Sequence, residues 1–113
     1  MSGISAHVLD LTRGKPAVGV AVRLSRKTEG AWLEVSRRET NAEGRVKSLL
    51  GDSEPPAPGE YRLHFETGEY FRRQGVEAFH PFVEITFEVR DEGEHCHIPL
   101  LVTPHSYSTY RGS

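Results

Sequence analysis

The fold of this chain is decided by the stretch Val83-Glu84-Ile85-Thr86-Phe87-Glu88-Val89-Arg90, in which apolar and polar side chains alternate without a break. The stretch Tyr61-Arg62-Leu63-His64-Phe65-Glu66 repeats the pattern. Successive side chains of a β-strand point to opposite faces of its sheet, so each stretch puts an apolar row toward a core and a mostly charged row outward. Both stretches therefore predict half-buried strands.

Weaker alternation and turn residues surround these two strands. Val20–Ser25 alternates less cleanly, and Leu33 and Val35 suggest a further strand. Glu54–Gly59 contains three prolines, which lack a backbone donor, so we expect a surface loop there. Short strands at this spacing predict an antiparallel sandwich or barrel. Gly68–Gly75 has strong helix formers and a closing glycine, and it predicts one short helix.

Composition excludes several classes of protein. The 113 residues suffice for a single domain, residues 1–113, and the hydrophobic fraction of 36% predicts a thin core that favours self-association. Fourteen basic against 16 acidic residues argue against nucleic acid or an anionic membrane as partner. No apolar run approaches the roughly 18 residues of a membrane-spanning helix. The N-terminus lacks the features of a secretory signal, and the single cysteine favours a reducing compartment, so we expect a cytoplasmic protein.

Two histidines stand out in the stretch His95-Cys96-His97-Ile98-Pro99-Leu100-Leu101-Val102. Parity in a strand places Cys96 and Ile98 on the core face and His95 and His97 on the opposite face. Leu101 shares that opposite face, which suggests that a partner subunit or a ligand covers it. A pair of ordinary surface histidines is an equally good interpretation at this point.

His7 and Arg45 are further candidates whose roles the pattern leaves open. His7 lies in a further predicted strand, Ile4–Asp10, on a row with Ser5 and Leu9 that the pattern assigns to neither face. Arg45 follows the Asn41–Gly44 turn, where a guanidinium is either solvated or aimed across a pocket mouth. His-x-His also forms half of a metal site, so zinc is a weaker alternative.

The C-terminal stretch Thr103–Ser113 stays aromatic and β-prone almost to its end. Chain ends are usually polar and fray. We therefore expect this tail to be docked on the rest of the protein.

Two long motifs at the two ends carry a family resemblance. HVLDLTRGKPAVGVAV (His7–Val22) and HCHIPLLVTPHSYSTYRGS (His95–Ser113) make the chain resemble the transthyretin-related 5-hydroxyisourate hydrolases over essentially its whole length. The ending Tyr-Arg-Gly-Ser is the mark that separates these enzymes from hormone-carrying transthyretins. The sequence departs from the family at Cys96 and His105, where an aromatic residue is usual, and at Thr103, where serine is usual.

The resemblance implies an all-β, transthyretin-like two-sheet antiparallel sandwich with one short helix, assembled as a homotetramer (a dimer of dimers) with active sites at the dimer–dimer interface. It implies hydrolytic ring opening of 5-hydroxyisourate without metal or cofactor. Either His7 or His97 would activate water, and Arg45 would stabilise the developing negative charge. By position, the implied catalytic residues are His7, Arg45, His97 and Ser113, and the implied substrate-binding residues are His95, Tyr110, Arg111 and Gly112. The competing interpretation is a non-catalytic carrier of the transthyretin type.

Overall fold

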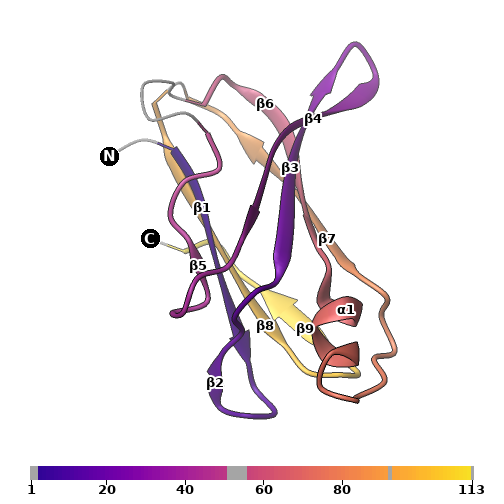
Figure 1. The fold of residues 1–113 in the computed structure, drawn as a ribbon. Coiled ribbons are helices and arrows are strands. Elements are labelled where there is room, and N and C mark those ends of the chain that lie inside the picture. Colours follow the sequence, from indigo (N-terminus) through magenta and orange to yellow (C-terminus); the bar gives the residue numbers. More distant parts are fainter. Residues whose placement is uncertain (1–2, 51–55, 92, 113) are drawn as a thin grey trace.

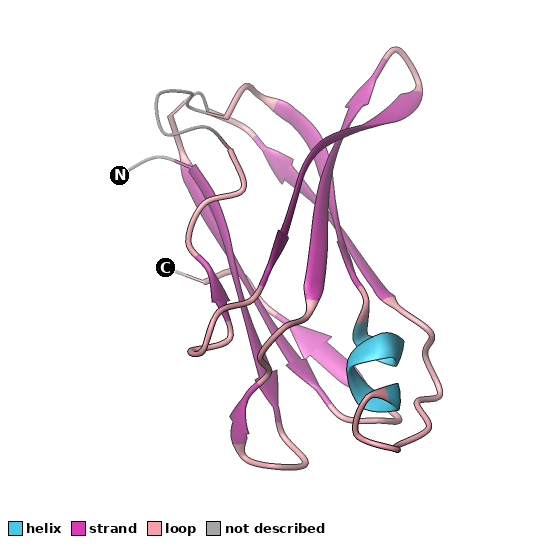
Figure 2. Ribbon diagram, viewed as in Figure 1, coloured by secondary structure: helices cyan, strands magenta, loops and turns pink. Residues whose placement is uncertain are grey.

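The computed structural model describes residues 3–50, 56–91 and 93–112, which form two β-sheets packed face to face with one short helix at an end of the sandwich (Figures 1 and 2). The predicted two-sheet sandwich with a short helix is therefore confirmed. The elements, in chain order, are β1 Gly3–Asp10, β2 Lys15–Pro16, β3 Ala21–Thr28, β4 Ala31–Glu39, β5 Arg45–Val46, β6 Gly59–Phe65, α1 Thr67–Arg72, β7 Val83–Val89, β8 His95–Val102 and β9 Tyr107–Thr109.

The first sheet has the order β2-β1-β8-β9, and β5 is a fifth strand that also pairs with β1. Its central pair departs from the expected antiparallel arrangement, because β1 and β8 run parallel, with Ser5 opposite His97. A parallel pair needs a long connection between its strands, and here that connection contains the whole second sheet. Period-two alternation carries no information on strand direction, so the sequence could not reveal this pairing.

The second sheet has the order β4-β3-β6-β7 and is antiparallel throughout. The two strands with the clearest alternation, β6 and β7, lie in it as neighbours, with Leu63 of β6 opposite Ile85 of β7. The strand suggested by Leu33 and Val35 is β4, an edge strand on which both side chains are exposed. The alternation of Leu33 and Val35 therefore predicted a strand correctly, although these side chains do not form a buried face.

The core lies between the sheets and contains the rows that the alternation predicts. Fully buried aliphatic and aromatic side chains come from both inner faces, and Cys96 faces the core as expected, with 8% of its surface exposed. The largest of them are Tyr61, Phe65, Phe71, Ile4, Leu24, Leu49, Leu63 and Leu100.

The helix α1 closes one end of the sandwich, away from the start of β1 (Figure 1). It begins at Thr67 and ends at Arg72, so it is shorter than the predicted Gly68–Gly75. The missing residues form its C-terminal cap: the Gly75 N–H donates to the Arg72 carbonyl and the Val76 N–H to the Phe71 carbonyl. In the described residues no helix is long and apolar enough to cross a membrane. Of the predicted loop Glu54–Gly59, residues 54 and 55 lie outside the described residues, and Gly59 already belongs to β6.

Candidate active site

Three strands of the first sheet bring polar side chains together on its outer face. β1 supplies Ser5 and His7, β5 supplies Arg45, and β8 supplies His95 and His97. The register places His7 opposite Arg45 and Ser5 opposite His97, so residues far apart in the sequence become neighbours. On β1 the alternate residues Ile4, Ala6 and Val8 are fully buried, which resolves the face of His7: it points outward.

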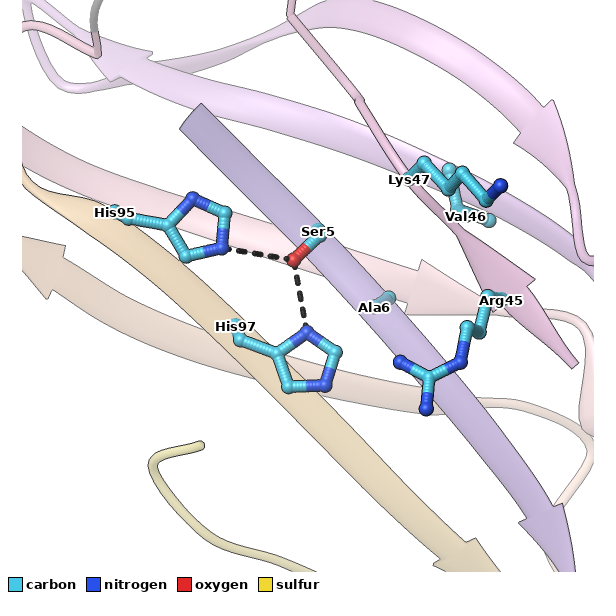
Figure 3. Close-up of a pocket in the computed structure, with 7 residues that line it drawn as sticks. All are labelled: Ser5, Ala6, Arg45, Val46, Lys47, His95 and His97. Atoms are coloured by element: carbon cyan, nitrogen blue, oxygen red, sulfur yellow. Dashed lines mark hydrogen bonds between the residues drawn. The ribbon is translucent and has the colours of Figure 1, made fainter. Parts of the chain in front are cut away.

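Ser5 lies between the two histidines of β8 (Figure 3). Its Oγ is 2.8 Å from His97 Nδ1 and 3.3 Å from His95 Nε2, and only 7% of its surface is exposed. Sequence reasoning missed Ser5. The available signal was its place two residues before His7, in the row opposite the apolar residues of β1.

A hydrogen bond to the main chain orients the ring of His7. Its Nε2 donates to the Glu43 carbonyl oxygen at 3.1 Å, and its ring centroid lies 6.4 Å from that of His97. A carbonyl only accepts, so a neutral His7 keeps its lone pair on Nδ1.

Burial and positive charge keep both rings neutral over a wider pH range. Partial burial, followed by the nearby guanidinium of Arg45, lowers the pKa of His7 below the usual imidazole value, although the Glu43 carbonyl opposes this. The pKa of His97 is lowered by burial, by Arg45 and then by His7 and His95. Near neutral pH such rings are available to accept or donate a proton.

Arg45 is held beside His7 by a tight turn. Its backbone N–H donates to Asn41 Oδ1 at 3.0 Å, and the Val8 N–H donates to the Gly44 carbonyl at 2.8 Å. A Cβ on Gly44 would lie 2.5 Å from the Val8 carbonyl oxygen, and its φ is +74°, so only glycine fits there. The guanidinium reaches over β1 toward His97 (Figure 3), and it forms no ion pair within the part of the chain that the structure describes.

An open cleft of about 270 Å³ lies over Ser5, Arg45, His95 and His97, and His7 is not among the described residues that line it. Lys47, which sequence reasoning did not single out, lines it two residues after Arg45. The other lining residues are Ser5, Ala6, Arg45, Val46, His95 and His97. The cleft therefore presents imidazole, hydroxyl and two cations to whatever enters it.

The C-terminal tail is docked along β8, as expected. β9 pairs with the end of β8, and the Gly112 N–H donates to the His97 carbonyl at 2.9 Å. A Cβ on Gly112 would lie 2.6 Å from His97 Cδ2, so the tail packs directly on this ring.

Tyr110 and Arg111 lie elsewhere than the histidine cleft in this chain. Both line a second cavity of about 270 Å³ between β7 and β8, and Arg111 Nη2 is 2.6 Å from Glu94 Oε2. Ser113 lies outside the described residues. Among the described tail residues, Gly112 packs on the His97 ring, and Tyr110 and Arg111 share the lining of the second cavity with His97.

Metal ligands do not converge in the described residues. No group of three or more His, Cys, Asp or Glu side chains within residues 3–50, 56–91 and 93–112 is arranged to hold a metal ion. His95 and His97 instead share the hydroxyl of Ser5.

Known proteins share both the sequence and the fold. Residues 4–112 match the model of the HIUase/Transthyretin family. A 5-hydroxyisourate hydrolase of Mus musculus is 43% identical over 114 residues, covering 99% of this chain and 96% of the relative. The structure of the Klebsiella pneumoniae 5-hydroxyisourate hydrolase is similar with a TM-score of 0.87, at 40% identity and full coverage of both chains. A transthyretin from Sparus aurata has a TM-score of 0.92 at 32% identity, covering 99% of this chain and 97% of its own.

Proposed function

Because this chain belongs to the HIUase/transthyretin family, we propose that the cleft lined by Arg45 and His97, with His7 opposite Arg45 on β1, is the active site of a 5-hydroxyisourate hydrolase. The activity follows from relatives of bacterial and animal origin, so the chain is a hydrolase of this class. One observation carries the assignment of the site: two imidazoles with lowered pKa values and a guanidinium without an ion pair in the described residues meet on one outer face.

The proposed reaction is attack of water on a ring amide carbonyl of 5-hydroxyisourate. One imidazole takes a proton from the water as its oxygen bonds to the carbonyl carbon. The resulting tetrahedral anion collapses, the ring C–N bond breaks, and the same imidazolium returns the proton to the leaving nitrogen. The product is the open-ring acid 2-oxo-4-hydroxy-4-carboxy-5-ureidoimidazoline. No net proton is gained by the protein in a cycle.

Arg45 supplies the fixed positive charge of this scheme. It stays protonated throughout and offers a planar fork of donors to a planar, polar substrate. Charge that develops on the carbonyl oxygen is stabilised by donors already in place, which is usually the largest contribution to catalysis. Lys47 adds a second cation to the same cleft.

We further propose that the enzyme is a homotetramer, a dimer of dimers. Two edges support this: β7 ends the second sheet and the tail strand β9 ends the first, and both border the cavity that contains Ile85 and Tyr110. Unpaired strand edges are sites for pairing with another chain. A second dimer would then cover the histidine face of the first sheet. Mass from light scattering after size exclusion tests this assembly.

The carrier alternative has no specific support in the cleft. Similarity of fold alone fits both classes, since a sea bream transthyretin in complex with thyroxine has a TM-score of 0.90. A cleft lined by His95, His97, Arg45 and Lys47 suits a polar oxidised purine better than a hydrophobic ligand.

The decisive assay follows the ultraviolet absorbance of freshly generated 5-hydroxyisourate with and without the protein. We expect faster decay that persists in a strong chelator. Unchanged decay at micromolar protein would refute the hydrolase, and loss of activity to chelator with recovery on adding zinc would refute the metal-free scheme.

A further inference from the structure

Ser5 is a buried hydroxyl placed between two imidazole nitrogens. Its Oγ is within hydrogen-bond distance of both His97 Nδ1 and His95 Nε2. A hydroxyl has one proton, so it donates to at most one of these nitrogens, and its hydrogen bond to the other needs a proton on that nitrogen. The protonation patterns of His95 and His97 are therefore coupled through Ser5.

The surroundings of His95 set the direction of the hydrogen bonds that link His95, Ser5 and His97. Its Nδ1 is buried and has no hydrogen-bond partner among the described residues. A proton on Nδ1 would leave a buried donor unpaired, which proteins avoid more strictly than an unpaired acceptor. A proton on Nε2 instead donates to Ser5 Oγ. Ser5 then donates to His97 Nδ1, which is also the shorter of its two contacts.

This direction decides which nitrogen of His97 carries the proton. Nδ1 accepts from Ser5, so neutral His97 is protonated on Nε2. Figure 3 shows that second nitrogen turned away from Ser5, on the side of Arg45. His97 Nε2–H and the guanidinium thus form a pair of donors suited to one carbonyl oxygen.

We propose that Ser5 is a positioning residue that holds His97 as the Nε2–H tautomer, which makes His97 the donor to the substrate and His7 the base. The part about roles rests on the proposed hydrolase function, whereas the tautomer of His97 does not. His7 fits the complementary role because its Nε2–H is bound to the Glu43 carbonyl and its Nδ1 is left to accept the proton of water. The lowered pKa values of His7 and His97 favour the neutral rings that this arrangement requires.

The test is nitrogen NMR on the full chain with ¹⁵N-labelled histidine, without substrate, at a pH above the titration of both rings. We expect pyrrole-type Nε2 and pyridine-type Nδ1 for His97, and the same pattern for His7. In Ser5→Ala the His97 signals should move toward a mixture of tautomers, whereas Ser5→Thr, which keeps the hydroxyl, should retain the wild-type pattern. Ser25→Ala, a serine change in the second sheet, is the matched control.

Kinetics provide the second readout. Ser5→Ala should lower kcat about tenfold, the scale of one hydrogen bond lost from a positioned group, with KM changed by less than about twofold. Ser5→Thr should restore most of kcat. A wild-type His97 protonated on Nδ1, or a tautomer unchanged in Ser5→Ala, would overturn the proposal. Activity on 5-hydroxyisourate is scored separately, so an inactive protein with the expected tautomer refutes the hydrolase while Ser5 keeps its positioning role.

Discussion

The outer faces of the two sheets each carry histidines on strands, with opposite chemical outcomes. On the second sheet, His64 of β6 is almost buried, and its two ring nitrogens lie 2.9 Å from Glu84 Oε2 and 2.6 Å from Glu66 Oε1. Its ring stacks on Phe82 with centroids 4.6 Å apart. Both ring nitrogens of His64 are therefore engaged by carboxylate groups of the protein itself.

The first sheet surrounds its histidines with cations and a hydroxyl instead. The largest charge effect on His7 and on His97 comes from Arg45, which lowers the pKa of each ring, whereas the hydrogen bond from His64 lowers the pKa of Glu84. Histidine in an outward-facing strand row is thus structural on the second sheet and available for proton transfer on the first sheet. What differs is the charge of the neighbours across the strands.

The largest expected effect is the loss of either site imidazole. His7→Asn and His97→Asn should each lower kcat/KM by about 10²–10⁴-fold, the usual contribution of a positioned proton-transfer or donor group. The melting temperature should change little, because both side chains lie on the outer face. His64→Asn is the matched control: its activity should stay within about twofold of wild type while its melting temperature falls, since two carboxylates lose their partner.

If His97→Asn retains more than about a third of the activity, the donor role belongs to another residue. If His64→Asn loses as much activity as His97→Asn, the contrast between the two faces fails.

Arg45→Gln should be the next most damaging change. Loss of a fixed donor to the developing oxyanion is expected to cost about 10²–10³-fold in kcat. Because Arg45 lowers the pKa of both rings, its removal should also raise their pKa values, which an NMR titration of His7 and His97 measures. Arg37→Gln, which removes an exposed arginine paired with Glu34 on the second sheet, should leave kcat and both titrations unchanged. Unmoved titrations in Arg45→Gln would contradict the proposed electrostatics.

The tail should have a smaller effect that depends on geometry. Gly112→Ala places a methyl group 2.6 Å from His97 Cδ2, so the ring or the tail must shift. We expect about a tenfold loss of activity, because small misplacements of a reacting group are costly, with secondary structure and mass unchanged. Ser108→Ala, on the exposed side of β9, should be neutral. Deletion of residues 110–113 should cost at least as much activity, and a correctly assembled truncation with full activity would reduce the tail to packing.

The pH dependence should show the smallest effect. Protonation removes the lone pair of the base, so kcat/KM must fall as the pH drops through the pKa of the free enzyme's imidazole. Burial and Arg45 lower that pKa, so the acidic limb should lie below the pH at which an exposed histidine titrates. Initial rates across the acidic range test this. An acidic limb above the usual imidazole pKa would contradict the proposal that burial and Arg45 lower the pKa of the base.

Alternation predicted the strands β3, β6, β7 and β8 because burial of one face of a sheet imposes it. It placed Cys96 and Ile98 inward and His97 outward correctly. It could not predict that β1 and β8 run parallel, nor therefore that Ser5 lies opposite His97, because cross-strand register is set by the tertiary fold.

The residues of the site likewise divide into those that the sequence predicted and those that only the structure revealed. His7, Arg45 and His97 were named from motifs and do meet in space, while Ser5 and Lys47 carry no motif and emerged only from the register of β1 and β5. Arg111 was assigned to the substrate because it belongs to the Tyr-Arg-Gly-Ser ending that carries the family resemblance. The structure pairs it with Glu94, a contact that sequence spacing does not show.

The central claim is that substrate binds on the outer face of the first sheet between the two site histidines. A crystal structure of the protein with urate, the unhydroxylated relative of the substrate, tests it most directly. We predict urate in the histidine cleft, with a ring carbonyl oxygen bound jointly by Arg45 and His97 Nε2. Urate bound instead in the cavity lined by Ile85 and Tyr110, without contact to Arg45 or His7, would contradict this placement.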